Sequence, residues 1–247
     1  MSDFEKKIDE LKKLIDKANR ICVFTGAGIS VPSGIPDFRS ADGLYSEIYK
    51  KNLRPEEIIS HSFFMRDPEM FYDFYKNKML FTDAKPNEAH LYFAELEKQG
   101  KHVAVVTQNI DGLHSIAENT NVMEIHGTVH ENFCMKCHAP YSLDYVVNYS
   151  GVPKCEKCGG TIKPNVVLYE EGLDDYTVSR AIDEIAGADL MIIIGTSLVV
   201  YPAASFVRYF RGDNLVLINK SETSMDGSAD LVFYNDVIEV VKALKRA

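Results

Sequence analysis

The sequence predicts an α/β protein in which a doubly wound, Rossmann-like parallel sheet carries a smaller second domain. Short apolar runs, including residues 21–24 and 190–194, alternate with segments of helical spacing along most of the chain. A glycine loop follows the first apolar run directly. Two stretches, 41–83 and 127–164, interrupt the alternation, and in the simplest architecture both leave the same sheet and pack together.

The expected domain boundaries follow from these interruptions. Residues 1–40, 84–126 and 165–247 would build the sheet domain, with 41–83 as an inserted helical module and 127–164 as a second module. The two modules would form the small domain, and a cleft would separate it from the sheet. The first module is rich in aromatic residues and methionine at helical spacing, so we expect these side chains to form a core and not a base-stacking platform.

The individual elements can be placed in chain order. Apolar residues recur at helical spacing from Phe4 to Ala18, which predicts a surface helix with one face on the core. Pro86 suits the first position of a helix that runs to Lys98 and stops at Gly100. The other expected elements are strands at 21–24, 103–106, 122–125, 190–194, 215–219 and 231–233, an extended run at 165–168, and helices at 174–186, from Pro202 and at 237–245, the last capped by Asp236.

The glycine loop has the chemistry of a phosphate cradle. In Gly26-Ala27-Gly28 the glycines would let backbone N–H groups approach a phosphate without a Cβ in the way, although an ordinary strand-to-helix turn also explains them. The loop ends in Asp37-Phe38-Arg39, and a phosphate cradle alone needs none of these three residues. A dehydrogenase is disfavoured because Val31 stands where its third glycine belongs, and because no second strand follows within about thirty residues.

Polar residues crowd the carboxyl end of the next strand, in Gln108-Asn109-Ile110-Asp111. Doubly wound sheets bind their ligands at such strand ends. Two histidines, His114 and His126, lie near strand ends facing the expected cleft, and either could act as a general base because the imidazole pKa is ordinarily near 6.5. Composition and spacing do not choose between these two histidines.

Four of the five cysteines form two Cys-x-x-Cys pairs, Cys134 with Cys137 and Cys155 with Cys158. Two such pairs at this separation predict a tetrahedral Cys₄ zinc site. Four thiolates leave no coordination position for water, so the metal would be structural and would stabilise a module too small to bury its own core. The fifth cysteine, Cys22, lies in the first apolar run and is expected to be a small core residue.

Composition excludes several functional classes. The 247 residues carry a formal net charge of −9, which disfavours binding to nucleic acid or to an anionic membrane and would suit a basic, lysine-bearing partner. The N-terminal residues are too charged for a signal peptide, and no apolar run is long enough to span a membrane. A reducing cytoplasm explains the cysteine pairs better than disulfides do.

Taken together, these motifs resemble the sirtuins, the Sir2-type NAD-dependent protein deacylases. The resemblance extends over about residues 15–242, and the chain looks like a compact prokaryotic member of the family. The motifs occur in the sirtuin order: Gly26-Ala27-Gly28-Ile29-Ser30, Ser33-Gly34-Ile35-Pro36-Asp37-Phe38-Arg39, Thr107-Gln108-Asn109-Ile110-Asp111, His126-Gly127, the four cysteines and Gly195-Thr196-Ser197-Leu198.

The resemblance implies a function and a set of residue roles. NAD and an acyl-lysine protein or peptide would enter the cleft from opposite sides, and the products would be deacylated lysine, nicotinamide and O-acyl-ADP-ribose. By motif, His126 would be the general base, which chooses it over His114, while Asn109 and Asp111 would act at the nicotinamide ribose and carboxamide. The other implied cofactor contacts are Gly26, Ala27, Gly28, Asp37, Phe38, Arg39, Gln108, Ile110, Gly195, Thr196, Ser197, Asn219, Lys220, Asp236 and Val237.

Two regions depart from the family pattern or bear on the acyl group. Where sirtuins usually show Phe-Gly-Glu, this chain has Tyr169-Glu170-Glu171. Val167 and Tyr169 can still contact the acyl-lysine stem. Glu170, however, replaces a glycine whose backbone pairs with the substrate peptide, which puts the peptide geometry and sequence preference in question. Tyr75 and Lys78 lie near the position of a Tyr-x-x-Arg pair in desuccinylating sirtuins, although a solvated helix face is the simpler interpretation. We expect acetyl-lysine to be accepted, with tolerance for other acyl groups.

Alternative functions remain open at this point. The same motifs would serve an NAD-dependent protein mono-ADP-ribosyltransferase, in which label from NAD ends on protein and not in a small acyl ester. A zinc-ribbon module that binds nucleic acid or protein is a third possibility, but the acidic balance and the few lysines between the cysteine pairs argue against nucleic acid.

Overall fold

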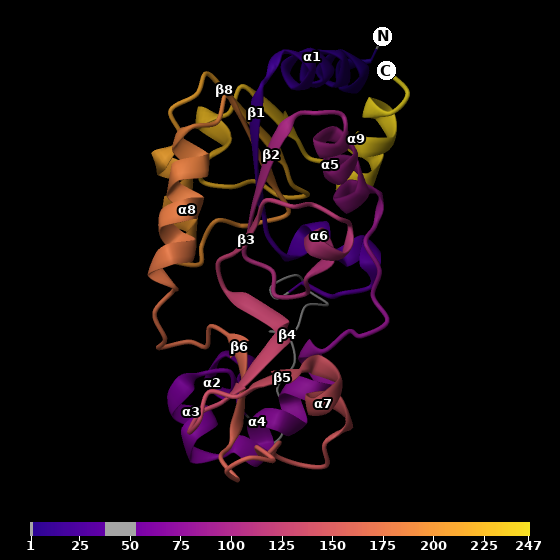
Figure 1. Ribbon diagram of the computed structural model, residues 1–247. Helices are drawn as coiled ribbons and strands as arrows, with labels where there is room; N and C mark the ends of the chain where they lie inside the picture. The colour runs from indigo at the N-terminus through magenta and orange to yellow at the C-terminus, as the bar shows by residue number, and fades with distance from the viewer. Residues whose placement is uncertain (1, 38–52) are drawn as a thin grey trace.

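The computed structural model describes residues 2–37 and 53–247 (Figure 1). Its larger sheet has six parallel strands in the order β3-β2-β1-β7-β8-β9, which confirms the predicted doubly wound α/β sheet. The strand order reverses between β1 and β7, and in open α/β sheets the crevice at such a switch point is where ligands bind. The strands are β1 Arg20–Thr25, β2 His102–Thr107, β3 Val122–Glu124, β7 Leu190–Ile194, β8 Asn214–Ile218 and β9 Leu231–Phe233.

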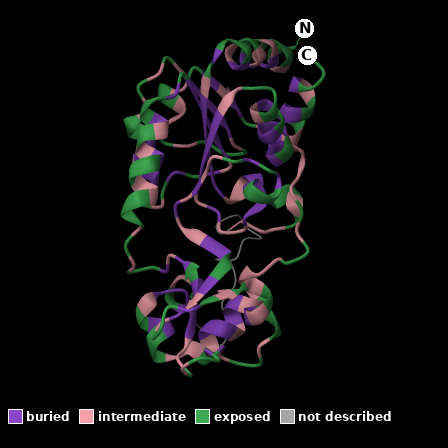
Figure 2. Cartoon of the chain, viewed as in Figure 1, coloured by how far each residue is buried: buried purple, intermediate pink, exposed green. Residues whose placement is uncertain are grey.

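Alternate residues of each central strand enter two separate cores. In β1, Ile21 and Val23 pack with helices α1, α5 and α9, whereas Cys22 and Phe24 pack with α8 and the 3₁₀ helix η6 on the other face. Because both faces are covered, the strands are buried and continuously apolar (Figures 1 and 2). The helices are α1 Asp3–Lys17, α5 Glu88–Lys98, α6 Leu113–Ile116, α8 Asp175–Ala186, η6 Ala203–Tyr209 and α9 Val237–Leu244.

A second body lies at the end of the molecule opposite the two chain termini (Figure 1). It contains a three-stranded antiparallel sheet in the order β5-β4-β6 and a group of short helices. Its elements are α2 Pro55–Ile58, α3 His61–Arg66, α4 Pro68–Phe74, a π-helical turn η5 Tyr75–Met79, β4 Gly127–Cys134, β5 Pro140–Ser142, α7 Leu143–Asn148 and β6 Ile162–Val166.

The helical module and the antiparallel sheet share one apolar core. Aromatic side chains such as Phe71 and Tyr72 are buried in the same cluster as Val129 of β4 and Ile162 of β6. The Tyr72 hydroxyl donates to the Ile162 carbonyl oxygen at 2.6 Å, which ties the two parts together. The expectation that the aromatic residues form a core is therefore confirmed for the described part of this segment.

Three elements differ from the sequence-based expectation. The extended run expected at 165–168 corresponds to β6, which begins and ends earlier, at Ile162 and Val166, and pairs with β4. Pro86 lies outside α5, because Asn87 caps that helix by accepting from the Ala89 N–H at 2.9 Å. The helix expected from Pro202 is a 3₁₀ helix that starts at Ala203.

Candidate active site

The glycine loop lies at the switch point, directly against the end of β7. Gly28 N–H donates to the Gly195 carbonyl oxygen at 2.8 Å, and a Cβ on Gly28 would lie 2.6 Å from the Gly195 Cα. A Cβ on Gly26 would meet the Thr196 side chain at 2.7 Å. Gly26 and Gly28 are therefore required because the glycine loop packs closely against the loop after β7. The sequence suggested only a phosphate contact and did not reveal this packing.

A buried polar cluster follows β2. The Asn109 amide donates to the Ser30 hydroxyl at 3.0 Å, and that hydroxyl donates to the Asp111 carboxylate at 2.7 Å. Asp111 also accepts from the Leu113 N–H at 2.9 Å. Burial raises the Asp111 pKa above its ordinary value, while these hydrogen bonds pull it down. The Asn109 and Asp111 side chains are therefore fixed relative to one another through Ser30.

His126 is the histidine that faces the cavity. Its Nδ1 lies 2.9 Å from the Gln108 carbonyl oxygen, which can only accept, so Nδ1 carries the proton and Nε2 keeps a free electron pair when the ring is neutral. Burial lowers the His126 pKa below its ordinary value, against the opposing effect of the Gln108 carbonyl. The side chain is therefore a neutral base at physiological pH.

His114 lies elsewhere. Its ring is buried, 4.7 Å from the ring of His90, and its Nε2 lies 3.3 Å from the Thr25 hydroxyl. It lines neither of the two cavities described below. Burial lowers the pKa of His114 to about 4 and that of His90 to about 2, so both rings stay uncharged in the core.

A cavity of about 720 Å³ opens between the large sheet and the small body. This size suits a dinucleotide together with part of a second substrate. Its walls include the glycine loop, the ends of β2, β7 and β8, and the segment after β6. The sequence-predicted residues that line it are Gly26, Ala27, Gly28, Asp37, Gln108, Asn109, Ile110, His126, Val167, Tyr169, Glu170, Gly195, Thr196, Ser197, Asn219, Lys220 and Val237.

A smaller cavity of about 90 Å³ adjoins the first and shares Ala27, Met79, Asn109 and Ile110 with it. Asp111 lines this second cavity and not the larger one. The polar cluster thus lies where the two cavities meet.

Several predicted residues occupy other positions. Asp236 lines neither cavity, because its carboxylate caps α9 through the Ile238 N–H at 2.9 Å and pairs with Lys220 at 2.8 Å. Tyr75 is fully buried in the core of the helical module, and both it and Lys78 lie outside the linings of the two cavities. Phe38 and Arg39 lie outside the described residues.

Sequence reasoning missed part of the wall. Val200, Tyr201 and Pro202 line the larger cavity from the loop after β7, and Ser221 and Asn235 line it from the loops after β8 and β9. Their position just beyond strand ends was the available signal, because that is where parallel sheets place ligands. None belongs to a recognisable motif.

The four paired cysteines converge in the small body. Within the described residues their sulfur atoms all lie within 4.8 Å of one another, and none forms a disulfide. Cys134 and Cys158, and likewise Cys137 and Cys155, are 3.5 Å apart at sulfur. Tetrahedral zinc with bonds of about 2.3 Å holds its thiolates about 3.8 Å apart, so these residues fit that ion. Cys22 lies in the sheet core with 0% exposure, as expected.

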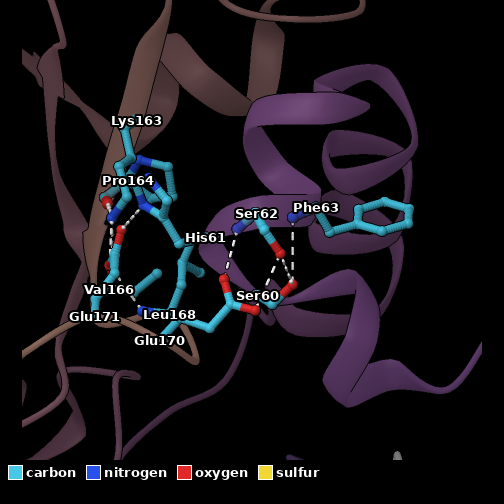
Figure 3. A network of polar contacts seen from close by, with 10 residues as sticks. All are labelled: Ser60, His61, Ser62, Phe63, Lys163, Pro164, Val166, Leu168, Glu170 and Glu171. Atoms are coloured by element: carbon cyan, nitrogen blue, oxygen red, sulfur yellow. Dashed lines mark hydrogen bonds and ion pairs between the residues drawn. The ribbon is translucent and has the colours of Figure 1, made fainter.

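The segment after β6 forms the small-body wall of the larger cavity. Val167 N–H donates to the His126 carbonyl oxygen at 2.9 Å, which joins this segment to the candidate base. Lys163 is buried and donates to the Val166 carbonyl oxygen at 2.9 Å and to the Glu171 carboxylate at 3.0 Å (Figure 3).

No helix of the described residues is long and apolar enough to cross a membrane.

Comparison with known proteins places the chain in one family. The profile of the Sir2 family matches residues 26–202. The chain is 54% identical over 238 residues to a protein of Clostridium perfringens named NAD-dependent protein deacetylase, covering 96% of this chain and 98% of that one.

Two solved structures are also similar, each at 39% identity and with 97% of both chains covered. One is a Sir2 complex with a p53 peptide and NAD⁺, with a TM-score of 0.85. The other is a Sir2 variant with a deacetylated p53 peptide and 3′-O-acetyl ADP ribose, with a TM-score of 0.87. The sheet, the cysteine cluster and these matches agree, and the chain belongs to the Sir2 family.

Proposed function

We propose that this protein is an NAD-dependent protein-lysine deacetylase, which transfers the acetyl group of a modified lysine to ADP-ribose and releases nicotinamide. The observation that carries the proposal is the setting of His126. A neutral imidazole with a fixed tautomer faces a cavity of dinucleotide size, and the polar cluster of Asn109 and Asp111 lies beside it. The name and bound products of the Sir2 relatives support the same reaction.

The substrates would meet at the polar cluster. NAD supplies a ribose carbon that accepts the acyl oxygen once the bond to nicotinamide is largely broken. Asn109 and Asp111, held by Ser30, would bind the ribose and the carboxamide in the reactive orientation, and positioning of this kind can provide much of a rate enhancement. His126 Nε2 would remove the proton from a ribose hydroxyl as that oxygen bonds to the acyl carbon, while the Gln108 carbonyl stabilises the resulting imidazolium through Nδ1–H. The bond between the acyl carbon and the lysine nitrogen would then break as water adds to that carbon, so that lysine leaves as the amine.

The rest of the cofactor would lie along the large sheet. Gly26, Ala27 and Gly28 would face the phosphates, together with Thr196 and Ser197 after β7. Asn219 and Val237 would contact the adenosine end, with Lys220 held in place by Asp236. Asp37, Gln108, Ile110 and Gly195 complete the proposed contacts, and Phe38 and Arg39 remain proposed contacts outside the described residues.

The acyl-lysine chain would enter from the small body, past Val167, Tyr169 and Glu170. Acetyl is the proposed acyl group. Tyr75 is buried, and so the structure gives no support to an acidic-acyl pocket built on Tyr75 and Lys78.

Zinc would be structural. It would join β4 to the loop before β6 and so hold the wall that carries Val167. We also propose the domain division expected above, with β6 crossing its 164/165 boundary, and a cytoplasmic location, on the ground that reduced paired thiols are needed for the metal.

The test is incubation with NAD and a set of peptides that differ in one lysine, carrying acetyl, butyryl, succinyl or no acyl group. Nicotinamide release that requires the acetyl peptide is the expected result. Release without any peptide, with label from NAD ending on protein, would favour ADP-ribosyl transfer. No release with any peptide would reject the proposal.

A further inference from the structure

The wall segment of residues 167–171 is fastened to the helical module through its backbone. His61 N–H donates to the Tyr169 carbonyl oxygen at 2.9 Å, and Tyr169 N–H donates to the Ile59 carbonyl oxygen at 3.1 Å. Ser60 and Tyr169 therefore form a parallel β-bridge. Because the wall segment also bonds to His126 through Val167, the helical module is connected to the candidate base by a short series of hydrogen bonds.

Glu170 adds a side-chain clasp to this backbone bridge. Its carboxylate accepts from the Ser62 N–H at 2.8 Å and from the Ser62 hydroxyl at 3.0 Å (Figure 3). The backbone of Glu170 is left-handed, with φ of 76°, a conformation that residues with a Cβ rarely adopt. A strained backbone at the edge of the cavity persists where surrounding contacts over-determine it, and the two bonds to Ser62 are such contacts.

The next residue holds the wall segment from the opposite side. The Glu171 carboxylate accepts from Lys163 Nζ at 3.0 Å and from the Leu168 N–H at 2.9 Å, and it lies 2.8 Å from His61 Nδ1. Figure 3 shows the two carboxylates pointing apart, Glu170 toward Ser62 and Glu171 toward Lys163. Two consecutive acids thus fix the wall segment to both α3 and β6.

Glu170 lines the larger cavity together with Val167 and Tyr169, but its carboxylate is bound to Ser62. The Tyr169 side chain is partly exposed. Glu170 is exposed, but both of its carboxylate oxygens accept hydrogen bonds from Ser62. Its carboxylate therefore connects two segments of the chain.

We propose that Glu170 is a positioning residue, whose clasp on Ser62 pre-orders the backbone of residues 167–169 for docking of the substrate peptide. The inference rests on the proposed deacetylase function. Pre-ordering lowers the entropy lost when the peptide docks, so the clasp acts on peptide affinity. It leaves the chemistry at the ribose to His126, Asn109 and Asp111.

A competing explanation is electrostatic, because Glu170 could attract a positively charged peptide without ordering anything. Glu170→Gln separates the two. The glutamine oxygen can accept from the Ser62 N–H and its amide can donate to the Ser62 hydroxyl, so the clasp survives while the charge is lost. Glu170→Ala removes both, and Glu170→Gly removes both while relieving the left-handed backbone.

The experiment measures steady-state kinetics with an acetyl-lysine peptide for wild type, these three variants and Ser62→Ala. We expect Glu170→Ala and Glu170→Gly to raise the peptide KM roughly five- to tenfold, with kcat and the KM for NAD within about twofold, because pre-organisation acts on binding. Glu170→Gln should stay within about twofold of wild type and Ser62→Ala should be intermediate. Glu69→Ala, at an exposed acid in the first turn of α4, is the matched control and should leave every constant unchanged.

Two kinetic results would overturn the clasp. One is an unchanged peptide KM in Glu170→Ala and Glu170→Gly, and the other is a Glu170→Gln variant as impaired as Glu170→Ala, which would assign the effect to charge. Thermal unfolding of each variant separates a general loss of folding from the expected effect.

A second readout does not need activity. Amide hydrogen exchange at Leu168 and Tyr169 should be at least about tenfold faster in Glu170→Ala than in wild type, since local opening governs exchange. Equal exchange would overturn the clasp. If wild type fails to turn over the acetyl peptide, the proposed function fails, and exchange still decides whether the clasp orders the wall segment.

Discussion

His126 Nδ1 and the Gln108 carbonyl oxygen are 2.9 Å apart, and this one hydrogen bond sets the tautomer of the candidate base. Gln108 is itself held from the other side, because its side-chain amide donates to the Thr196 hydroxyl at 3.0 Å. The end of β2 is thereby tied to the loop after β7, on the same edge of the sheet as the glycine loop. The candidate base His126, the glycine loop and the wall segment form one connected set of contacts.

Replacement of the base gives the first prediction. His126→Ala should lower kcat for deacetylation by at least about 100-fold, the usual contribution of a positioned general base. Zinc content and NAD binding should persist, since the four clustered cysteines and the proposed phosphate and adenosine contacts are unchanged in this variant. Turnover, bound zinc and NAD titration on one preparation provide the measurement, and near-normal turnover would remove His126 from its role.

The pH dependence of the reaction is the second prediction. Burial lowers the His126 pKa below its ordinary value near 6.5, and the base must be neutral to accept a proton. Activity should therefore be retained as the pH falls to 6.5 and be lost only below it. The acid limb of a kcat/KM profile in the free enzyme measures this. An acid limb above pH 7 would contradict the assignment.

A third prediction concerns stability and the buried pair of His90 and His114. Burial lowers their pKa values to about 2 and about 4, whereas the unfolded chain binds protons below about 6.5. Their contribution to stability is complete above pH 6.5 and is lost as the pH falls toward 4. In that pH range, each buried ring should lower the free energy of unfolding by about 1.4 kcal/mol for every unit by which the pH falls.

Urea denaturation at pH 7, 6 and 5 tests this slope. A His90→Phe variant keeps a ring in the core but cannot bind a proton, so its stability should fall less steeply with decreasing pH than that of wild type. Identical slopes would show that the pair does not titrate in this range.

Close packing of the glycine loop gives the fourth prediction. In Gly28→Ala the new Cβ would lie 2.6 Å from the Gly195 Cα, where only backbone movement can make room. We expect a loss of about 1–3 kcal/mol in unfolding free energy and a weaker affinity for NAD. Gly227→Ala is the control, because its Cβ would enter open space and its backbone is not left-handed. Equal stability of the two variants would refute the packing account.

Metal removal gives the fifth prediction. Cys155→Ser should abolish stoichiometric zinc binding and expose β4, β5 and β6 to protease, because the small sheet depends on the site for its folding energy. Strands of the large sheet should stay protected. Cys22→Ala should retain full zinc, since that thiol lies in the sheet core. Full zinc content in Cys155→Ser would exclude this cysteine as a ligand.

The large sheet could be predicted because its strands are buried on both faces. Runs such as 190–194 are continuously apolar for that reason, and parallel strands of this kind give a strong signal. The cysteine pairs were equally informative, because metal coordination demands both a residue type and a spacing. The bounds of β6 were missed because Lys163, Pro164 and Asn165 interrupt its apolar pattern, and its pairing with β4 depends on contacts far apart in sequence.

The geometry of the site was less accessible from the sequence. The sequence predicted that Asp236 caps α9, and its bond from the Ile238 N–H confirms this, but the ion pair between Asp236 and Lys220 could not be predicted. The burial of Tyr75 agrees with the aromatic core expected from helical spacing, and not with the solvated helix face considered for Tyr75 and Lys78. Glu170 was noted as a departure at a glycine position, yet its bonds to Ser62 join residues more than a hundred positions apart.

The central claim is that the acetyl group leaves the lysine for ADP-ribose. The most direct measurement uses a peptide labelled in its acetyl group together with NAD, and follows the label and the nicotinamide in one reaction. The account predicts one nicotinamide for each lysine deacetylated, with the label recovered in an acetyl ester of ADP-ribose. Label recovered as free acetate from the start of the reaction, without matching nicotinamide, would contradict it.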